Sequence, residues 1–264
     1  MDSSVIAVAG SRRFWSELRV TFLVLFLASL WAGAQNALAG GGSFLTLPSL
    51  MLTGMDARAA NITSTIALFP AQLATGATGW SNVKGAANLS FVTLVVISLV
   101  GGALGAILLL VTPPSFFARL VPWLVLFATG VFAWGSFAPK RNRAAGLGRW
   151  GAGAAQLCIS IYGGYFGGGI GFLMLAALTA AGLAIRAAGA TKNVLAGVMN
   201  ASAVAIFVFS PEVRWIQAGI ACAGAVIGGV LGGLMLNRIN PKILRIVVIV
   251  IGAALTVGLF LDSP

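Results

Sequence analysis

The sequence predicts an all-α integral membrane protein made of two homologous repeats. Of its 264 residues, 59% are hydrophobic and 8% are charged, whereas a soluble domain carries about a quarter charged residues. Ten apolar segments follow one another along the chain, and most have close to the ~20 residues that a helix needs to cross a bilayer. Landmarks of the first half recur in the second half, which indicates an internal duplication.

The duplication is visible as a constant spacing of glycine and proline landmarks. Three residues recur 127 positions later: Gly40 as Gly167, Gly101 as Gly228, and Pro114 as Pro241. The longest polar break separates the two halves. We therefore expect an N-terminal arm (1–17), a first transmembrane repeat (18–138), a basic connecting loop (139–150) and a second transmembrane repeat (151–264).

Each repeat is expected to hold a glycine-broken helical hairpin followed by three transmembrane helices. The apolar segments of the first repeat are 18–38, 43–54, 61–80, 88–111 and 119–138. Those of the second repeat are 151–166, 170–183, 190–210, 213–236 and 242–261. The second segment of each repeat is short. At 1.5 Å per residue, segment 43–54 would cover only about half of a ~30 Å hydrocarbon core.

The glycine breaks are candidate anion-binding sites. A break followed by a short helix leaves backbone N–H groups unpaired at membrane depth, and the helix N-terminus adds a partial positive charge. Transporters with paired repeats place such broken helices where the repeats meet. The residues expected at the site are Gly40, Gly41 and Gly42 with Gln35, Asn36 and Ser43, and Gly167, Gly168 and Gly169 with Tyr162 and Tyr165.

A second polar cluster follows each hairpin and supplies donors suited to an oxyanion. It comprises Asn61, Thr63 and Ser64 in the first repeat and Thr191, Lys192, Asn193 and Asn200 in the second. Two alternatives stay open. Hydroxyls at the start of a segment also serve as helix caps, and Lys192 can instead extend to the membrane surface.

Four other glycines are expected to have a packing role. Gly101, Gly105, Gly228 and Gly232 have no polar neighbours in the sequence. Small residues at such spacing let membrane helices approach each other closely.

The composition also excludes several classes of function. The chain has no histidine, and its five acidic residues lie near segment ends. It contains no nucleotide-binding loop, no paired catalytic carboxylates and no metal-binding cluster. We therefore expect no enzyme, no catalytic residue, no metal site and no cofactor. The net charge of +11 comes from basic residues in short loops, which is typical of topology signals rather than of nucleic-acid binding.

Four stretches of the sequence resemble the TauE/SafE family of sulfite and sulfonate exporters. They are "NALAGGGSFLTLP" (Asn36–Pro48), "ANITSTIALFP" (Ala60–Pro70), "YGGYFGGGIGFLMLAAL" (Tyr162–Leu178) and "ATKNVLAGVMNA" (Ala190–Ala201). With the spacing of the segments, the resemblance covers nearly the whole chain. It departs from the family pattern at Ile62, where a small residue is common.

The resemblance implies a multi-pass secondary transporter of the bacterial inner membrane. Its expected substrates are small sulfur-containing anions such as sulfite or organosulfonates. The alternatives are an anion channel or a carrier of non-sulfur organic acids. The expected partners are the anionic substrate and the lipid bilayer, with no nucleic acid. Assembly into a homo-oligomer stays open. The resemblance also implies that the glycine breaks and the second polar clusters form the substrate site.

The orientation of the repeats is predicted from the distribution of basic residues. If each repeat has a returning hairpin and three crossings, the repeats are inverted, and ten of the 16 Lys and Arg residues lie in the cytoplasm. If each hairpin region crosses once, the repeats are parallel and nine lie inside. We expect inverted repeats, because they bring both glycine breaks to the midplane from opposite sides.

Overall fold

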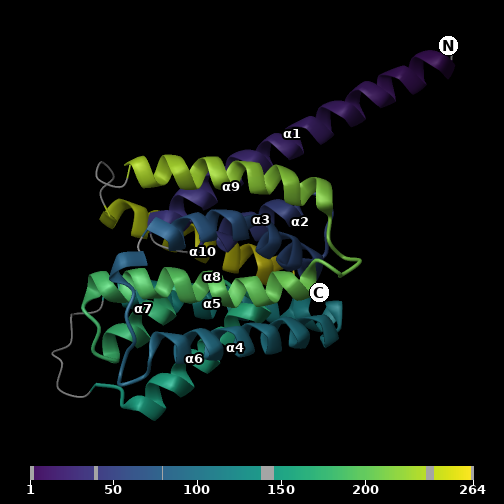
Figure 1. Ribbon diagram of the computed structural model, residues 1–264. Helices are drawn as coiled ribbons and strands as arrows, with labels where there is room; N and C mark the ends of the chain where they lie inside the picture. Colours follow the sequence, from purple (N-terminus) through teal and green to yellow (C-terminus); the bar gives the residue numbers. More distant parts are fainter. Residues whose placement is uncertain (1–2, 39–40, 79, 138–145, 236–240, 263–264) are drawn as a thin grey trace.

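The computed structural model describes residues 3–38, 41–78, 80–137, 146–235 and 241–262. Within these ranges every regular element is a helix (Figure 1). They are α1 (Ser3–Leu38), α2 (Ser43–Met51), α3 (Ala57–Thr78), η1 (Trp80–Asn82), α4 (Phe91–Val111), α5 (Pro114–Phe137), α6 (Arg149–Tyr165), α7 (Ile170–Ala180), α8 (Ile185–Phe207), α9 (Trp215–Met235) and α10 (Pro241–Asp262). The prediction of an all-helical protein is confirmed.

The helix boundaries follow simple sequence signals. Pro114 and Pro241 are the first residues of α5 and α10, a position where the missing proline N–H costs nothing. Ser90 caps α4 by accepting a hydrogen bond from the backbone N–H of Thr93 at 3.0 Å. Both prolines of the 127-residue spacing therefore begin a helix.

Helix α1 is longer than the first apolar segment. It spans 36 residues, about 54 Å at 1.5 Å per residue, and its N-terminal part projects beyond the other helices (Figure 1). The segment expected as a separate arm, 1–17, thus continues into the first helix from Ser3 onward. The physical reason is the lack of a strong helix breaker there, since its single glycine, Gly10, costs only about 1 kcal/mol relative to alanine.

Helices from the two halves of the chain pack against one another throughout the protein. Helix α1 lies along α9, and its counterpart α6 lies along α4 (Figure 1). Helices α3 and α8 contact each other, and each also contacts the fourth helix of the opposite half, α9 and α4 respectively. Helix α5 contacts α10. Each first helix therefore packs mainly on the other half, so neither half forms the interior alone.

The four packing glycines lie at these contacts between the halves. A Cβ atom at Gly228 of α9 would overlap the backbone carbonyl of Leu30 in α1. A Cβ atom at Gly105 of α4 would overlap the carbonyl oxygen of Ile161 in α6. Gly101 and Gly232 face the same two partner helices. The prediction that these glycines permit close packing is confirmed.

Four helices of the described chain are long and apolar enough to cross a membrane. They are α4, α5, α8 and α9, over Phe91–Val111, Pro114–Gly135, Ile185–Phe207 and Trp215–Gly232. The outer face of α4 shows why: from Val96 to Val111 its exposed side chains are large and apolar. Helix α3 falls below this threshold because it carries Asn61, several hydroxyls and Gln72. The number of crossings expected from the sequence stays a prediction.

One partly buried ion pair also connects the two halves. Among the described side chains it is the single salt bridge, and it joins Arg58 near the start of α3 to Glu212 in the connection between α8 and α9. Arg58 also donates to the backbone carbonyls of Leu110 and Thr112 at the end of α4. The arginine thereby ties three elements together.

Candidate functional site

Both glycine breaks have backbone conformations that only glycine adopts easily. Gly41 has a φ of 84° just before α2, while Gly167 and Gly169 have φ of 79° and 74° just before α7. Left-handed φ values of this kind are strained for residues with a Cβ atom. Glycine therefore lets the chain reverse direction sharply and begin a new helix at each break.

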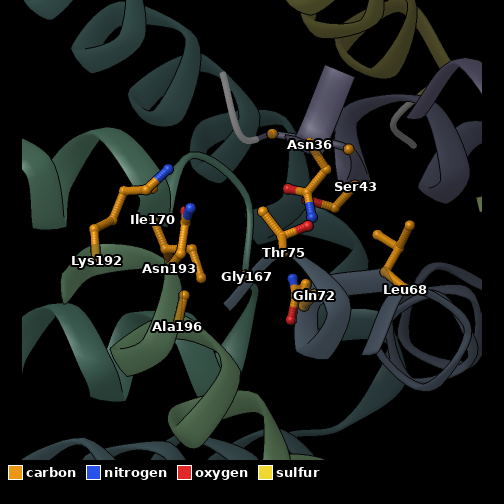
Figure 2. Close-up of a pocket in the computed structure, with 13 residues that line it drawn as sticks. Asn36, Ser43, Leu68, Gln72, Thr75, Gly167, Ile170, Lys192, Asn193 and Ala196 are labelled. Atoms are coloured by element: carbon orange, nitrogen blue, oxygen red, sulfur yellow. The ribbon is translucent and has the colours of Figure 1, made fainter. Parts of the chain in front are cut away.

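The two breaks line one cavity. Its volume is about 40 Å³, and Figure 2 shows most of the side chains around it. The lining residues are Asn36, Gly41, Gly42, Ser43, Leu68, Gln72, Thr75, Gly167, Ile170, Gly171, Lys192, Asn193 and Ala196. They come from α1, the start of α2, α3, the break before α7, the start of α7, and α8. The cavity thus draws its walls from both halves of the chain.

Polar side chains face each other across this cavity. Lys192 and Asn193 of α8 lie on one side, and Asn36 and Ser43 lie on the other (Figure 2). Gln72 of α3 lies below them, with its amide nitrogen toward the cavity. The amide oxygen of Gln72 accepts a hydrogen bond of 2.5 Å from Asn200. Asn200 therefore leaves the N–H groups of Gln72 available to a ligand.

The electrostatics of the cavity favour an anion. Helices α2 and α7 both begin at its wall, and the N-terminus of a helix carries a partial positive charge. Lys192 is the one charged residue among the described lining residues. The single salt bridge between described side chains lies at Arg58 and Glu212, so Lys192 has no carboxylate partner in that part of the chain. Its ammonium group therefore remains available to a bound anion.

The size of the cavity suits a small ligand. A cavity needs about 10–15 Å³ to hold one water molecule, so 40 Å³ has room for about three. A compact oxyanion of a few heavy atoms has a similar size. Among the described residues, no group of three or more His, Cys, Asp or Glu side chains could hold a metal ion.

The structure brings seven of the expected site residues to the cavity and leaves the others elsewhere. The seven are Asn36, Gly41, Gly42, Ser43, Gly167, Lys192 and Asn193. Gly40 lies outside the described residues. Lys192 is the eighth residue of α8, about 10 Å along the helix from its start at 1.5 Å per residue, and it lines the cavity there.

Two expected residues support the lining without being part of it. The side-chain amide of Gln35 donates to the backbone carbonyl of Gly41 at 3.1 Å, which holds the first break in place. Asn200 orients Gln72, as described above. Both side chains are almost fully buried, with exposed fractions of 1% and 4%.

Two expected threonines instead hold loops of the opposite half. The hydroxyl of Thr63 on α3 accepts a hydrogen bond from the backbone N–H of Arg214, just before α9. The hydroxyl of Thr191 on α8 accepts one from the backbone N–H of Lys84 at 3.0 Å and donates to its carbonyl oxygen. The two hydroxyls therefore perform matching structural tasks in the two halves.

The remaining polar residues of the first cluster also bind protein atoms. Asn61 donates to the backbone carbonyl of Tyr165 at 3.0 Å, so it connects α3 to the second break. The hydroxyl of Ser64 lies 2.5 Å from that of Thr46. Both contacts are buried. The first joins α3 to the end of α6, and the second joins α3 to α2.

The tyrosines and the other glycines of the second break pack against aromatic rings and helix α5. The ring of Tyr162 contacts those of Phe127 and Phe166, and the ring of Tyr165 contacts that of Phe117. A Cβ atom at Gly168 would overlap the Phe166 ring, and one at Gly169 would press on Ala128 of α5. None of these four residues lines the described cavity.

Sequence reasoning missed six lining residues. They are Leu68, Gln72, Thr75, Ile170, Gly171 and Ala196. A usable signal existed for two of them. Gln72 and Thr75 are polar residues three positions apart inside an apolar segment, so they share one face of α3, and polar residues within a membrane helix commonly mark a substrate path.

Comparison with known proteins identifies the family. The family model described as "Sulfite exporter TauE/SafE" matches residues 25–259. The chain belongs to the TauE/SafE family. The match includes every helix of the structure, apart from residues 3–24 of α1 and the last three residues of α10.

The relatives of this TauE/SafE protein are named as membrane transporters. A "Probable membrane transporter protein" of Haemophilus influenzae is 28% identical over 246 residues, which cover 91% of this chain and 94% of the relative. "Probable membrane transporter protein YfcA" of Escherichia coli K12 is 27% identical, and the alignment covers 90% of that relative. "Probable membrane transporter protein ORF9" of a Sinorhizobium species is 26% identical, and the alignment covers 92% of that relative. The chain is therefore a membrane transporter of this family.

Proposed function

We propose that this TauE/SafE protein is a secondary carrier of a small oxyanion, such as sulfite or an organosulfonate, in the bacterial inner membrane. The main support is the cavity at which both glycine breaks meet Lys192. It combines helix N-termini, amide and hydroxyl donors and one full positive charge. The family description refers to sulfite export, whereas the names of the relatives specify no substrate.

The packing of the helices supports a carrier built from two related repeats. Exchange of the two halves converts the α1–α9 contact into α6–α4, and the α3–α9 contact into α8–α4. Transporters of this kind bind substrate at the interface of their repeats and open alternately to the two sides. The cavity has walls from both halves, as that mechanism requires.

Counterflow measures the proposed activity directly. Proteoliposomes that contain the full-length protein and unlabelled sulfite should take up labelled sulfite faster than empty ones, with saturation at high concentration. A carrier gives this result because its site is exposed to one side at a time. An anion channel, the main alternative, would give flux without counterflow. Absence of counterflow for every sulfonate, sulfur oxyanion and carboxylate tested would contradict the proposal.

The predicted inverted topology can be tested with two single cysteines. In a Cys158→Ser/Cys222→Ser background, Arg13→Cys and Asn142→Cys should react with a membrane-impermeant maleimide from opposite sides. Three crossings and a returning hairpin place these positions on opposite faces, whereas parallel repeats place both in the cytoplasm. The native cysteines are replaced because Cys158 is exposed. Asn142 itself lies outside the described residues. Labelling of both from the same side would overturn the inverted arrangement.

A further inference from the structure

A second, larger space, here called the apolar chamber, adjoins the polar cavity and is open on one side, where Leu73 and Trp80 are 51% and 62% exposed. Its volume is about 320 Å³, and it lies between the C-terminal half of α3, η1 and the middle of α8. Gln72 and Asn193 line both spaces. The polar cavity and the apolar chamber therefore lie side by side and share two polar residues.

The walls of the larger chamber are apolar apart from the two shared residues. The remaining lining consists of glycine and apolar side chains, including Leu73, Ala77 and Trp80 on one side and Val194, Val198 and Ala201 on the other. Its volume falls in the ~300–1,000 Å³ range of small-molecule sites. The polar cavity, at about 40 Å³, has room for a small head group but not for a longer tail.

We propose that the substrate is an amphipathic monoanion, with a sulfonate or carboxylate head in the polar cavity and an apolar tail of several carbons in the larger chamber. The inference rests on the proposed function, since it assigns the head to the same anion site. It specifies the size and the polarity of the substrate. The tail passes Gln72 and Asn193 and then lies between α3 and α8.

Two glycines create the space for the tail. A Cβ atom at Gly197 on α8 would meet no atom within 4 Å. A Cβ atom at Gly76 on α3 would lie 3.6 Å from the carbonyl oxygen of Asn193, an ordinary contact. Neither glycine has a positive φ. Side chains would therefore fit at both positions, and their absence keeps the chamber open beside the polar cavity.

A homologous series of ligands tests the proposal on the unmodified protein. Binding of n-alkanesulfonates with one to six carbons to the purified full-length protein is measured by isothermal titration calorimetry. Affinity should rise roughly twofold to fourfold per methylene group, as expected for apolar surface removed from water. The n-alkanols of equal length lack the anionic head and should bind far more weakly.

A substitution that fills the chamber should abolish this dependence on length. In Gly197→Leu the ratio of the dissociation constants for methanesulfonate and hexanesulfonate should fall to near one. Gly189→Leu is the matched control on the same helix, because a Cβ atom there also meets nothing within 4 Å and the residue lines neither chamber. Its ratio should equal that of the unmodified protein. Ala201→Leu provides a second variant that narrows the chamber.

The outcomes separate this inference from the proposed function. If methanesulfonate binds and affinity does not change with chain length, the tail assignment is wrong and the anion site stands. If alkanols bind as tightly as alkanesulfonates, the chamber holds a lipid acyl chain instead, which also overturns the inference. If neither sulfite nor any alkanesulfonate or alkanecarboxylate binds, the proposed function fails and the inference fails with it.

Discussion

Lys192→Gln is expected to weaken binding of the transported anion by roughly thirtyfold or more. Lys192 carries the one full positive charge among the described lining residues, in a cavity otherwise built from dipoles. Loss of one partner of a buried charged pair commonly costs about 2–5 kcal/mol, and the neighbouring N–H groups should keep the cost near the lower end, about 2 kcal/mol or thirtyfold. Lys192→Arg keeps the charge and should lose less. Calorimetric titration with sulfite or methanesulfonate measures the effect.

Arg186→Gln is the matched control for this experiment. Arg186 lies on the same helix, is exposed and does not line the cavity. An exposed charge contributes about 1 kcal/mol or less, so affinity should change by no more than about fivefold. Thermal unfolding without ligand should show that all three variants are folded. An unchanged affinity in Lys192→Gln would mean that the Lys192 side chain extends to the membrane surface and that other residues bind the anion.

Gly228→Ala is expected to destabilise the protein strongly. The added methyl group would overlap the backbone carbonyl of Leu30, where α9 packs on α1. Extra methyl groups in close-packed interiors cost about 1–3 kcal/mol, and the upper end applies here because backbone atoms cannot rotate away. Helix association in membranes depends largely on such packing. The fraction of protein that remains monodisperse after heating in detergent should therefore fall at a lower temperature than in the unmodified protein.

Gly219→Ala separates this packing effect from the general effect of replacing glycine. Gly219 lies on the same helix, and a Cβ atom there would meet nothing within 4 Å. Alanine should stabilise the helix by up to about 1 kcal/mol relative to glycine, so the heated variant should survive as well as the unmodified protein or better. If Gly228→Ala and Gly219→Ala behave alike, α1 and α9 do not pack as closely as described.

The positions of the helices could be predicted from the sequence because a bilayer imposes a simple rule. Backbone polar groups must be satisfied within each segment, so every long apolar run becomes a helix. The start of α5 differed from the expected 119 because Pro114 begins the helix. Helix α1 begins at Ser3 rather than at the expected 18, because a change from apolar to polar residues does not by itself end a helix.

The roles of the polar residues could be predicted only in part. Thr63 and Lys192 each look like a substrate ligand in the sequence, since both are polar residues near the start of an apolar segment. In the structure Thr63 binds the backbone of Arg214, whereas Lys192 lines the cavity. A polar side chain inside a membrane protein needs a partner, and the sequence does not say whether that partner is protein or ligand.

The sequence by itself determined the membrane class, the helices, the two glycine breaks and the close-packing glycines. These features follow from local rules of hydrophobicity, chain reversal and side-chain size. Only the tertiary structure decided which polar residues share the cavity, because its walls come from both halves and depend on how α3 and α8 face each other. It also decided that Gln72 and Asn193 separate a polar cavity from an apolar chamber, since that boundary exists only once helices from the two halves are packed together.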